Sequence, residues 1–294
     1  AGDASAIRRM QQEIWSSEAD FLYPVDLHSA QFHAGSSLIA KFDGDPVGFL
    51  FGFYSYNGPP LPDGWGQPAG GGPHRLRIES QLLGVVPTFR GRNIGGALKA
   101  AQAEQAGANG VSVIHWTVDP LQYPNARLNF GQLGAVAFTF YRNYYTFRNA
   151  LNQTPASRLG ITWLVDSTRV RHLLQQIGDG TPPTDGAADL GFPGPGWRKI
   201  EFGQEPELDD GPPLVAIEIP AYWTTLQKED PELAGTWRAS TDAVFERILG
   251  IRTDRYVITG VGAEKERKYL LAQRSDNALL KSLGEKNDAS GATI

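Results

Sequence analysis

The chain has 294 residues, of which 41% are hydrophobic and 20% charged, with a formal net charge of −5 at pH 7. This composition is that of a globular protein with a sizeable core, and its acidic balance argues against a general binder of nucleic acid or of membrane surfaces. The absence of cysteine excludes disulfides, thiolate metal ligands and a cysteine nucleophile.

Hydrophobic periodicity and turn signals predict the elements of the first half of the chain. In chain order these are a helix over 4–15, a short helix capped by Asp26 and running to about 33, a hairpin of strands 37–42 and 46–54, a long Gly/Pro-rich loop over 57–73, a strand over 76–86, a helix to about 108 and a strand over 111–116. A helix separates the last two strands, which predicts a parallel crossover.

The second half is predicted by the same signals. It comprises a short helix over 123–133, strands at 135–145 and 161–165, a helix over 167–177, a strand at 214–219, a long helix, and a hairpin of 256–261 with 269–272. Gly/Pro-rich residues 178–196 are the best candidate for a linker. We therefore expect a first domain over 1–177, a C-terminal strand–helix–hairpin subdomain over 197–275 and a polar tail over 276–294.

The most informative stretch runs from Val85 to Leu98, where an apolar strand meets a proline and a glycine- and arginine-bearing turn opens an alanine-rich helix. Such a turn presents unpaired backbone N–H groups at the positive end of a helix, a geometry that binds phosphate. The spacing fits neither the nucleotide P-loop nor the dinucleotide-binding loop. A strand–turn–helix junction without a ligand is the alternative.

The residues Arg90, Asn93 and Gly95 resemble the Gln/Arg-x-x-Gly-x-Gly/Ala motif of the GCN5-related N-acetyltransferase (GNAT) superfamily. Asn93 replaces the middle glycine, and asparagine tolerates the left-handed backbone. Segments 116–121, 125–129, 133–135, 217–220 and 236–238 resemble a branch of predicted acyltransferases that includes amino-acid N-succinyltransferases. The resemblance implies an α+β fold, with a central mixed sheet whose parallel strands splay apart, flanking helices and a C-terminal strand–helix–hairpin extension.

The same resemblance implies an acyl-CoA-dependent N-acyltransferase that moves an acetyl or succinyl group to the amine of a small molecule or amino acid. Acetyl-CoA, or another acyl-CoA such as succinyl-CoA, would be bound by Leu83, Gly84, Val85, Val86, Arg90, Gly91, Arg92, Asn93, Ile94, Gly95, Gly96, Asn125 and Phe130. No metal is expected, because the five histidines show no ligand spacing. A CoA-binding, regulatory or protein-interaction module with reduced catalysis on the same scaffold is the alternative.

The catalytic residues are expected near the splayed strands. Glu79 is the candidate base, or else a strand-edge carboxylate paired with Arg75 or Arg77. Even spacing keeps Glu79 on the face of Val85 unless a bulge intervenes. The acid is a tyrosine in many members, but the matching position here is Phe130, so we expect Tyr141, Tyr144 or Tyr145 to donate the proton, unless the thiolate leaves without an acid.

Three further residues are candidates for substrate binding, each with a simpler alternative. His115 lies on a strand that should line the acyl site, although a core histidine fits as well. Asp119 could pair with a substrate ammonium or form a turn before Pro120. Arg127 could bind a carboxylate or be a solvated helix residue.

The expected partners follow from the same features. We expect a small amine or amino acid as the substrate and neither nucleic acid nor membrane as a partner. No apolar run is long enough to span a bilayer and the first residues lack a signal-peptide core, so a cytoplasmic location is the expectation. A homodimer is one assembly that the sequence allows.

Overall fold

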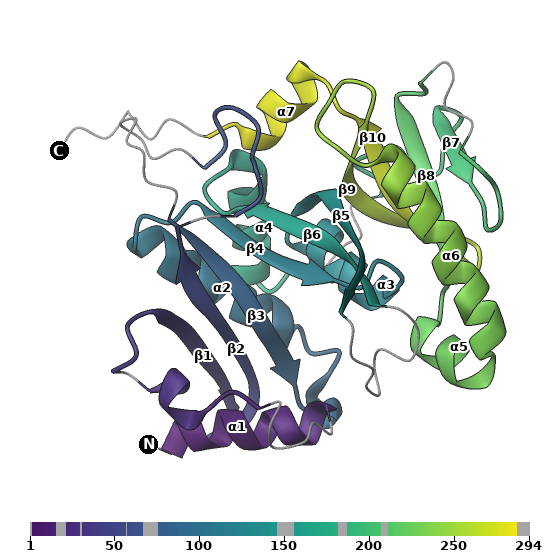
Figure 1. Ribbon diagram of the computed structural model, residues 1–294. Helices are drawn as coiled ribbons and strands as arrows, with labels where there is room; N and C mark the ends of the chain where they lie inside the picture. The colour runs from purple at the N-terminus through teal and green to yellow at the C-terminus, as the bar shows by residue number, and fades with distance from the viewer. Residues whose placement is uncertain are drawn as a thin grey trace, which may run out of the picture.

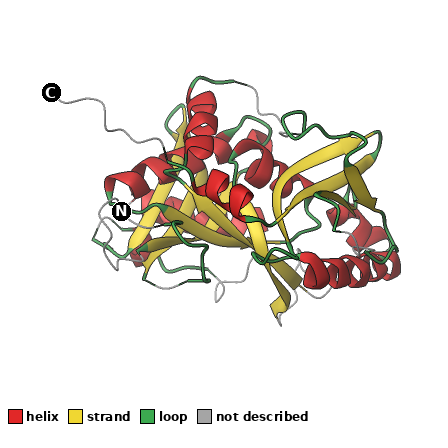
Figure 2. Cartoon of the chain, turned by 90° about the horizontal axis from the view of Figure 1, so that it is seen from above, coloured by secondary structure: helices red, strands yellow, loops and turns green. Residues whose placement is uncertain are grey.

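The computed structural model describes residues 2–15, 22–29, 31–56, 58–66, 76–145, 156–181, 187–206 and 211–286. Its framework is a ten-stranded mixed sheet in the order β1-β2-β3-β4-β6-β5-β9-β10-β8-β7. Helices pack on the sheet from both sides (Figures 1 and 2). The predicted α+β class, with a mixed sheet flanked by helices, is confirmed.

The strands are β1 (Gly35–Phe42), β2 (Asp45–Ser55), β3 (Arg77–Val85), β4 (Val113–Val118), β5 (Val136–Tyr145), β6 (Ala156–Leu164), β7 (Trp197–Ile200), β8 (Leu214–Ile219), β9 (Tyr256–Glu264) and β10 (Arg267–Arg274). The α-helices are α1 (Gly2–Trp15), α2 (Ile94–Ala108), α3 (Tyr123–Ala126), α4 (Thr168–Gly178), α5 (Trp223–Glu229), α6 (Pro231–Ile248) and α7 (Asn277–Gly284). Short 3-10 turns occupy η2 (Val25–His28) and η3 (Pro87–Phe89), and a π-helical turn, η4 (Arg127–Gln132), continues α3.

One expected helix is wrong. The segment after Asp26 forms the single 3-10 turn η2 instead of a helix to residue 33. The buried His28 ring lies 3.1 Å from Gln11 Nε2 and 3.2 Å from Ser37 Oγ. These contacts hold the chain against α1 and β1, and the extended backbone of Ser29, with φ of −78° and ψ of 154°, ends the turn.

The two faces of the N-terminal part of the sheet are covered by different helices. The Ile7 and Met10 side chains of α1 pack with Phe49 on one face. Ala103 and Ala106 of α2 pack with Ile78 on the other. We call these the α1 face and the α2 face. They matter because side chains that are neighbours along β3 or β4 point to opposite faces.

Strands β3 and β4 form a fork. They are parallel and pair only at Ile78–Ile114 and Glu79–His115. Beyond this point β3 stays with β2 through Val85, β4 stays with β6 through Val118, and the two diverge (Figure 1). The predicted splaying of the parallel strands is confirmed. Within the described parts of the chain, no strand pairs with the fork side of β3 after Glu79.

A β-bulge in β3 lies at the apex of this fork. Phe51 of β2 pairs with Leu82 and Gly52 pairs with Ser80, so Gln81 is the extra residue. Ser80 bonds to side chains of α2, whereas Leu82 packs with the α1 residues. The bulge therefore reverses the alternation, and Glu79 lies on the α1 face while Val85 lies on the α2 face.

The C-terminal part extends the same sheet. Strand β9 joins β5 through the pair Ala137–Ile258, and β10, β8 and β7 follow in that order. The predicted strand 214–219, the long helix and the hairpin are confirmed, and β7 is an additional strand.

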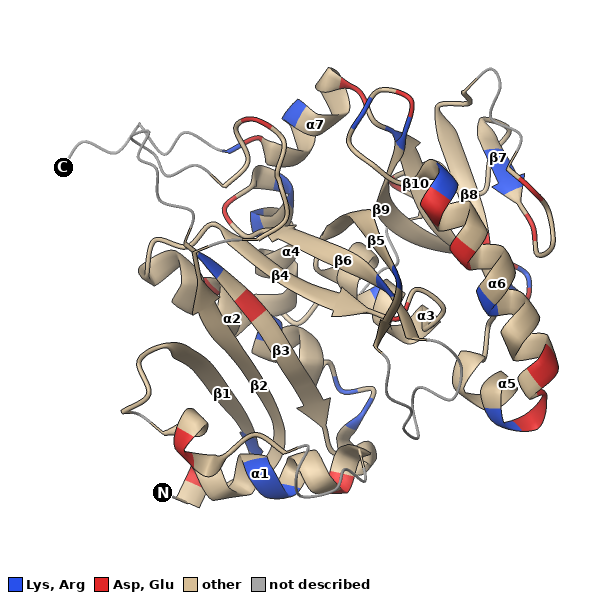
Figure 3. Ribbon diagram, in the orientation of Figure 1, with Lys and Arg blue, Asp and Glu red and all other residues tan. Residues whose placement is uncertain are grey.

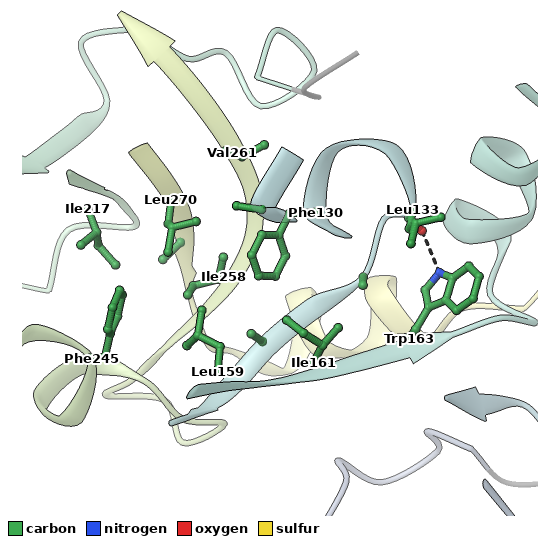
Figure 4. Packing of buried hydrophobic residues seen from close by; sticks show 14 of the residues in the cluster. Phe130, Leu133, Leu159, Ile161, Trp163, Ile217, Phe245, Ile258, Val261 and Leu270 are labelled. Atoms are coloured by element: carbon green, nitrogen blue, oxygen red, sulfur yellow. Dashed lines mark hydrogen bonds between the residues drawn. The ribbon is translucent and has the colours of Figure 1, made fainter. Parts of the chain in front are cut away.

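A shared core joins the two parts of the sheet. Phe130, Leu159 and Trp163 from the first part lie in one cluster with Phe245 and Leu270 from the second (Figure 4). The indole Nε1 of Trp163 donates a 2.8 Å hydrogen bond to the Leu133 carbonyl. The linker over 178–196 stays a prediction; within it, residues 182–186 lie outside the described residues, and Ala187 and Phe192 pack with Trp197 and Tyr269.

Candidate active site

The turn between β3 and α2 has the backbone that the sequence predicts. Gly91 has φ of 80°, and Asn93, the N-cap residue of α2, has φ of 58° and ψ of 18°. No side chain caps α2, and in the part of the chain that the structure describes no acceptor reaches the amides of Gly95 and Gly96. These donors at a positive helix end are available to an anion.

The two glycines at the start of α2 have different surroundings. A Cβ on Gly96 would clash with Asn93 Oδ1 and Gln132 Nε2, which bond to each other. A Cβ on Gly95 would meet nothing closer than 3.8 Å, at Leu83 and Leu128. The fold therefore explains Gly96 but leaves space beside Gly95, where a ligand can approach the backbone.

Two exposed arginines flank these amides. Arg90 Nε donates a 3.3 Å hydrogen bond to the Val85 carbonyl. The Arg92 guanidinium lies 5.1 Å from the centre of the Phe89 ring. Figure 3 shows this basic turn after β3, away from the acidic band on that strand. Both cations can add to the attraction of a phosphate.

A cavity of about 310 Å³ opens on the α1 face at the apex of the fork. Its lining comes from a loop and from β3, β4, β5 and β6: Pro59, Glu79, His115, Trp116, Thr117, Thr139, Tyr141, Tyr144, Gly160, Ile161 and Thr162. The structure thus brings together the predicted residues Glu79, His115 and Tyr141. Thr117 and Thr139 share the cavity because alternate residues of adjacent strands face the same side. Tyr144 joins them because β5 is irregular between Tyr141 and Tyr145.

The Glu79 carboxylate is half-buried, and no described residue bonds to it. Among the described residues no hydrogen bond or ion pair reaches it, and Arg75 lies outside them. Burial raises the pKa of Glu79, and the positive charge of Arg77 lowers it in part. A raised pKa suits a general base that works near neutral pH.

His115 is fixed as a neutral ring. Arg77 Nη1 lies 3.1 Å from Nε2 and can only donate, so Nδ1 carries the proton and donates to the Ile161 carbonyl at 3.2 Å. Burial, followed by the charge of Arg77, lowers the pKa of His115 to about 4. The ring lines the cavity but is 4% exposed, which favours the core-histidine alternative.

The candidate tyrosines are placed differently. Tyr141 lines the cavity, and burial, then Tyr144 and Glu79, raise the pKa of its hydroxyl. The Tyr145 ring lies 4.9 Å from the Arg158 guanidinium, outside the cavity lining. Of the three candidate acids, Tyr141 and Tyr144 line the cavity with Glu79, and Tyr145 does not.

Asp119 lies at the end of β4, within a charged cluster. Its Oδ2 accepts from Arg238 Nη2 at 2.7 Å and from Trp223 Nε1 at 3.1 Å, and Arg158 Nη1 lies 3.6 Å away. Its Oδ1 accepts from the amide of Leu121 at 3.0 Å, as a turn-forming aspartate does. This arrangement favours the structural alternative over ammonium binding.

The remaining predicted residues are not gathered at the cavity. Asn125 and Arg127 are exposed on α3 and η4. Phe130 lies in the core and is 1% exposed (Figure 4). The cause is the π-helical turn, which directs Phe130 to the C-terminal part of the sheet. Their roles in CoA and substrate binding stay predictions.

The sequence analysis missed Lys99. Its side chain is 2% exposed, and Nζ bonds to Ser80 Oγ at 2.8 Å and to Gln102 Oε1 at 3.2 Å, 3.7 Å from the centre of the Trp116 ring. Burial lowers the pKa of Lys99 to about 7. The spacing of Gly96, Lys99, Ala103 and Ala106 is the helical period, so the sequence did place this lysine on the buried stripe of α2.

Two further properties concern the described residues alone. They contain no group of three or more His, Asp and Glu side chains arranged to hold a metal ion. No helix among them combines the length and the hydropathy needed to cross a membrane.

Comparison with known proteins gives a family match and structural likenesses. Residues 4–131 match the family model described as the acetyltransferase (GNAT) family. None of the curated proteins compared with the chain matches it.

Three solved structures illustrate the structural likenesses. The ribosomal-protein-S18-alanine N-acetyltransferase from Escherichia coli is 14% identical over 56% of this chain and 89% of its own, with a TM-score of 0.40. NAA60 from Arabidopsis thaliana, in complex with a bisubstrate analogue, is 16% identical over 55% and 92%, with a TM-score of 0.43. Ard1 from Thermoplasma volcanium is 16% identical over 55% and 90%, with a TM-score of 0.37.

Proposed function

Residues 4–131 belong to the acetyltransferase (GNAT) family, and from this premise we propose that the protein transfers an acetyl group from acetyl-CoA to the amine of a small molecule. The observation that carries the proposal is the uncommitted Glu79 carboxylate in a cavity at the apex of the fork. The other end of the fork is the open turn with its free amides. A ligand that lies along the fork would reach both the amides of the turn and Glu79.

The residues present fit coenzyme A. Its pyrophosphate would lie against the amides of Gly95 and Gly96, with Arg90 and Arg92 beside it. The pantetheine arm would run between β3 and β4, where the edge of β3 offers unpaired backbone groups. One of these N–H groups, in the stretch from Leu83 to Val85, would stabilise the negative charge on the carbonyl oxygen.

Glu79 would prepare the acceptor. An amine attacks a thioester only when it is neutral, so its ammonium form must first lose a proton. The ionised Glu79 carboxylate can take this proton directly or through a water, and burial among strand residues keeps its pKa raised for the task.

The cavity also favours particular substrates. Among its described lining residues there is no lysine or arginine to pair with the free carboxylate of a succinyl group. Glu79 and the rings of Tyr141 and Tyr144 instead suit a cationic amine. A volume of about 310 Å³ is at the small end for ligand sites, which favours an acetyl group and a compact acceptor.

Calorimetry with acetyl-CoA and succinyl-CoA, followed by a thiol-trapping assay over a panel of amines, tests this function. We expect micromolar binding of acetyl-CoA and amine-dependent release of CoA. Failure to bind either thioester below the millimolar range would sink the proposal. Binding without release for any amine would favour a CoA-binding module, and preference for succinyl-CoA would overturn the assignment of the acyl group.

A further inference from the structure

Lys99 lies at the apex of the fork on the α2 face. The last paired residues of the two strands are Glu79 and His115. The Lys99 ammonium contacts the next residue of each strand, Ser80 on β3 at 2.8 Å and Trp116 on β4 at 3.7 Å to the ring centre. The bulge at Gln81 follows directly. Lys99 therefore spans the point at which the strands separate.

No anionic partner explains this buried cation. No carboxylate lies within 4.0 Å of Lys99 among the described residues, and its contacts are Ser80, Gln102 and two indole rings. The nearest titratable groups on the strands packed against it, Glu79 and His115, face the cavity on the α1 face. Burying an unpaired ammonium is unfavourable, so a purely structural role is better served by an apolar side chain.

We propose that Lys99 is the proton donor to the sulfur of coenzyme A as the thioester bond breaks. This inference rests on the proposed function, because it requires acyl-CoA in the fork. The apex is where a thioester that enters between β3 and β4 comes closest to both Glu79 and Lys99. The two groups then approach it from opposite faces of the sheet.

The step balances with the groups named. Glu79 first passes the ammonium proton on to solvent. The neutral amine nitrogen then forms a bond to the carbonyl carbon, and the second proton that it loses goes to Glu79, which releases it to solvent before the next turnover. The bond between that carbon and sulfur breaks, the electron pair stays on sulfur, and the Lys99 ammonium transfers a proton to it. Neutral Lys99 regains a proton from solvent before the next turnover. An amine whose pKa is about 7 can hold and release that proton near neutral pH.

The other candidate donors are less well placed. Phe130 carries no acidic proton and lies in the core. The Tyr141 hydroxyl is on the α1 face beside Glu79, where its pKa is raised. Tyr144 lines the same cavity, and Tyr145 is next to Arg158. Lys99 lies at the apex on the α2 face, whereas the Arg77 guanidinium contacts His115.

Titration of bound CoA tests the proposal without an acceptor amine. The chain has no cysteine, so the ultraviolet absorbance of thiolate, measured as the difference from the CoA-free protein, comes from CoA alone. An ammonium beside the sulfur stabilises the thiolate. We expect the pKa of the bound thiol to be about one unit or more below that of free CoA.

Three variants make the test specific. Lys99→Met keeps the length of the side chain and removes its charge, so the shift of the bound thiol should disappear while the melting temperature stays or rises. Lys99→Arg keeps a charge but cannot release a proton near neutral pH. It should retain the thiol shift yet turn over as slowly as Lys99→Met. Glu104→Gln, an exposed change on the same helix, is the control.

With an amine that the protein acylates, we expect kcat to be at least tenfold lower in Lys99→Met. The wild-type kcat should decline above pH 7 as Lys99 loses its proton, and this decline should be absent from the variant. Ser80→Ala should move the decline of kcat to lower pH, because Ser80 Oγ accepts a hydrogen bond from the Lys99 ammonium and stabilises it. The maximal kcat should change little, because Ser80 is a positioning residue. An unshifted bound thiol, or an unchanged kcat profile in Lys99→Met, would overturn the role of Lys99. A parallel loss of CoA binding and of melting temperature would do the same. If the wild type binds no CoA, the proposed function itself fails.

Discussion

The carboxylates of Glu79 and Asp119 occupy contrasting regions of the same sheet. Asp119 accepts hydrogen bonds from Arg238, Trp223 and a backbone amide, and joins β4 to the C-terminal helices. Glu79 lies in a cavity with no bond to it from the described residues. A satisfied carboxylate stabilises a fold, whereas an unsatisfied one is kept at a cost to stability and is available for chemistry.

Glu79→Gln is the most direct test of the role of the unsatisfied carboxylate. The amide has nearly the same shape but cannot accept the acceptor's proton, so we expect kcat to fall by about 10²–10⁴. Because the raised pKa of Glu79 means that the folded protein favours the neutral form, stability at pH 7 should not decrease. Steady-state rates and thermal melts measure both, with Glu104→Gln as the control. If Glu79→Gln kept the wild-type rate, Glu79 would not be the general base.

Asp119→Asn should show the opposite pattern, a loss of stability with little direct effect on the rate. It removes the charge opposite Arg238, whose side chain is 4% exposed, and we expect a loss of about 3 kcal/mol in the free energy of unfolding. Asp254→Asn, which affects the exposed pair with Arg252, should change the urea midpoint very little. If Asp119→Asn kept full stability but lost amine affinity, Asp119 would be a substrate ligand after all.

A third variant tests the free amides at the N-terminus of α2, which are unsatisfied donors in the way that Glu79 is an unsatisfied acceptor. Gly95→Glu should fit the open space and favour the positive helix end, so the melting temperature should hold or rise. The added charge should raise the Kd for CoA about tenfold, which is about 1.4 kcal/mol. Gly95→Ala, allowed by space and by the motif, should bind CoA normally. Equal affinities of both variants in calorimetry would argue against a pyrophosphate at this turn.

The smallest effect on the rate is expected at His115. Its pKa of about 4 keeps it neutral, so the acid limb of kcat/KM should follow Glu79 and persist in His115→Gln. The unfolded histidine titrates near 6.5, so the stability gained from the neutral native ring should be lost as the pH falls from about 6.5 to about 4. Urea unfolding against pH should show this slope in the wild type and not in the variant.

Local signals explain which parts of the site the sequence could predict. The left-handed Asn93, the open turn and the splayed strands follow from glycine, asparagine and strand–helix order within a few residues. The face of Glu79 could not be predicted, because it depends on the bulge at Gln81. The core position of Phe130 depends on a π-helical turn, and the bonds of Asp119 depend on Arg238, more than a hundred residues along the chain.

Strand β9 has a consequence for how copies of this protein can associate. By pairing with β5 it covers an edge of the N-terminal part of the sheet. Among the described strands, the sheet is left with β1 and β7 at its two ends. A dimer built by joining sheets would therefore have to form at one of these distant edges, and neither contributes a residue to the lining of the cavity.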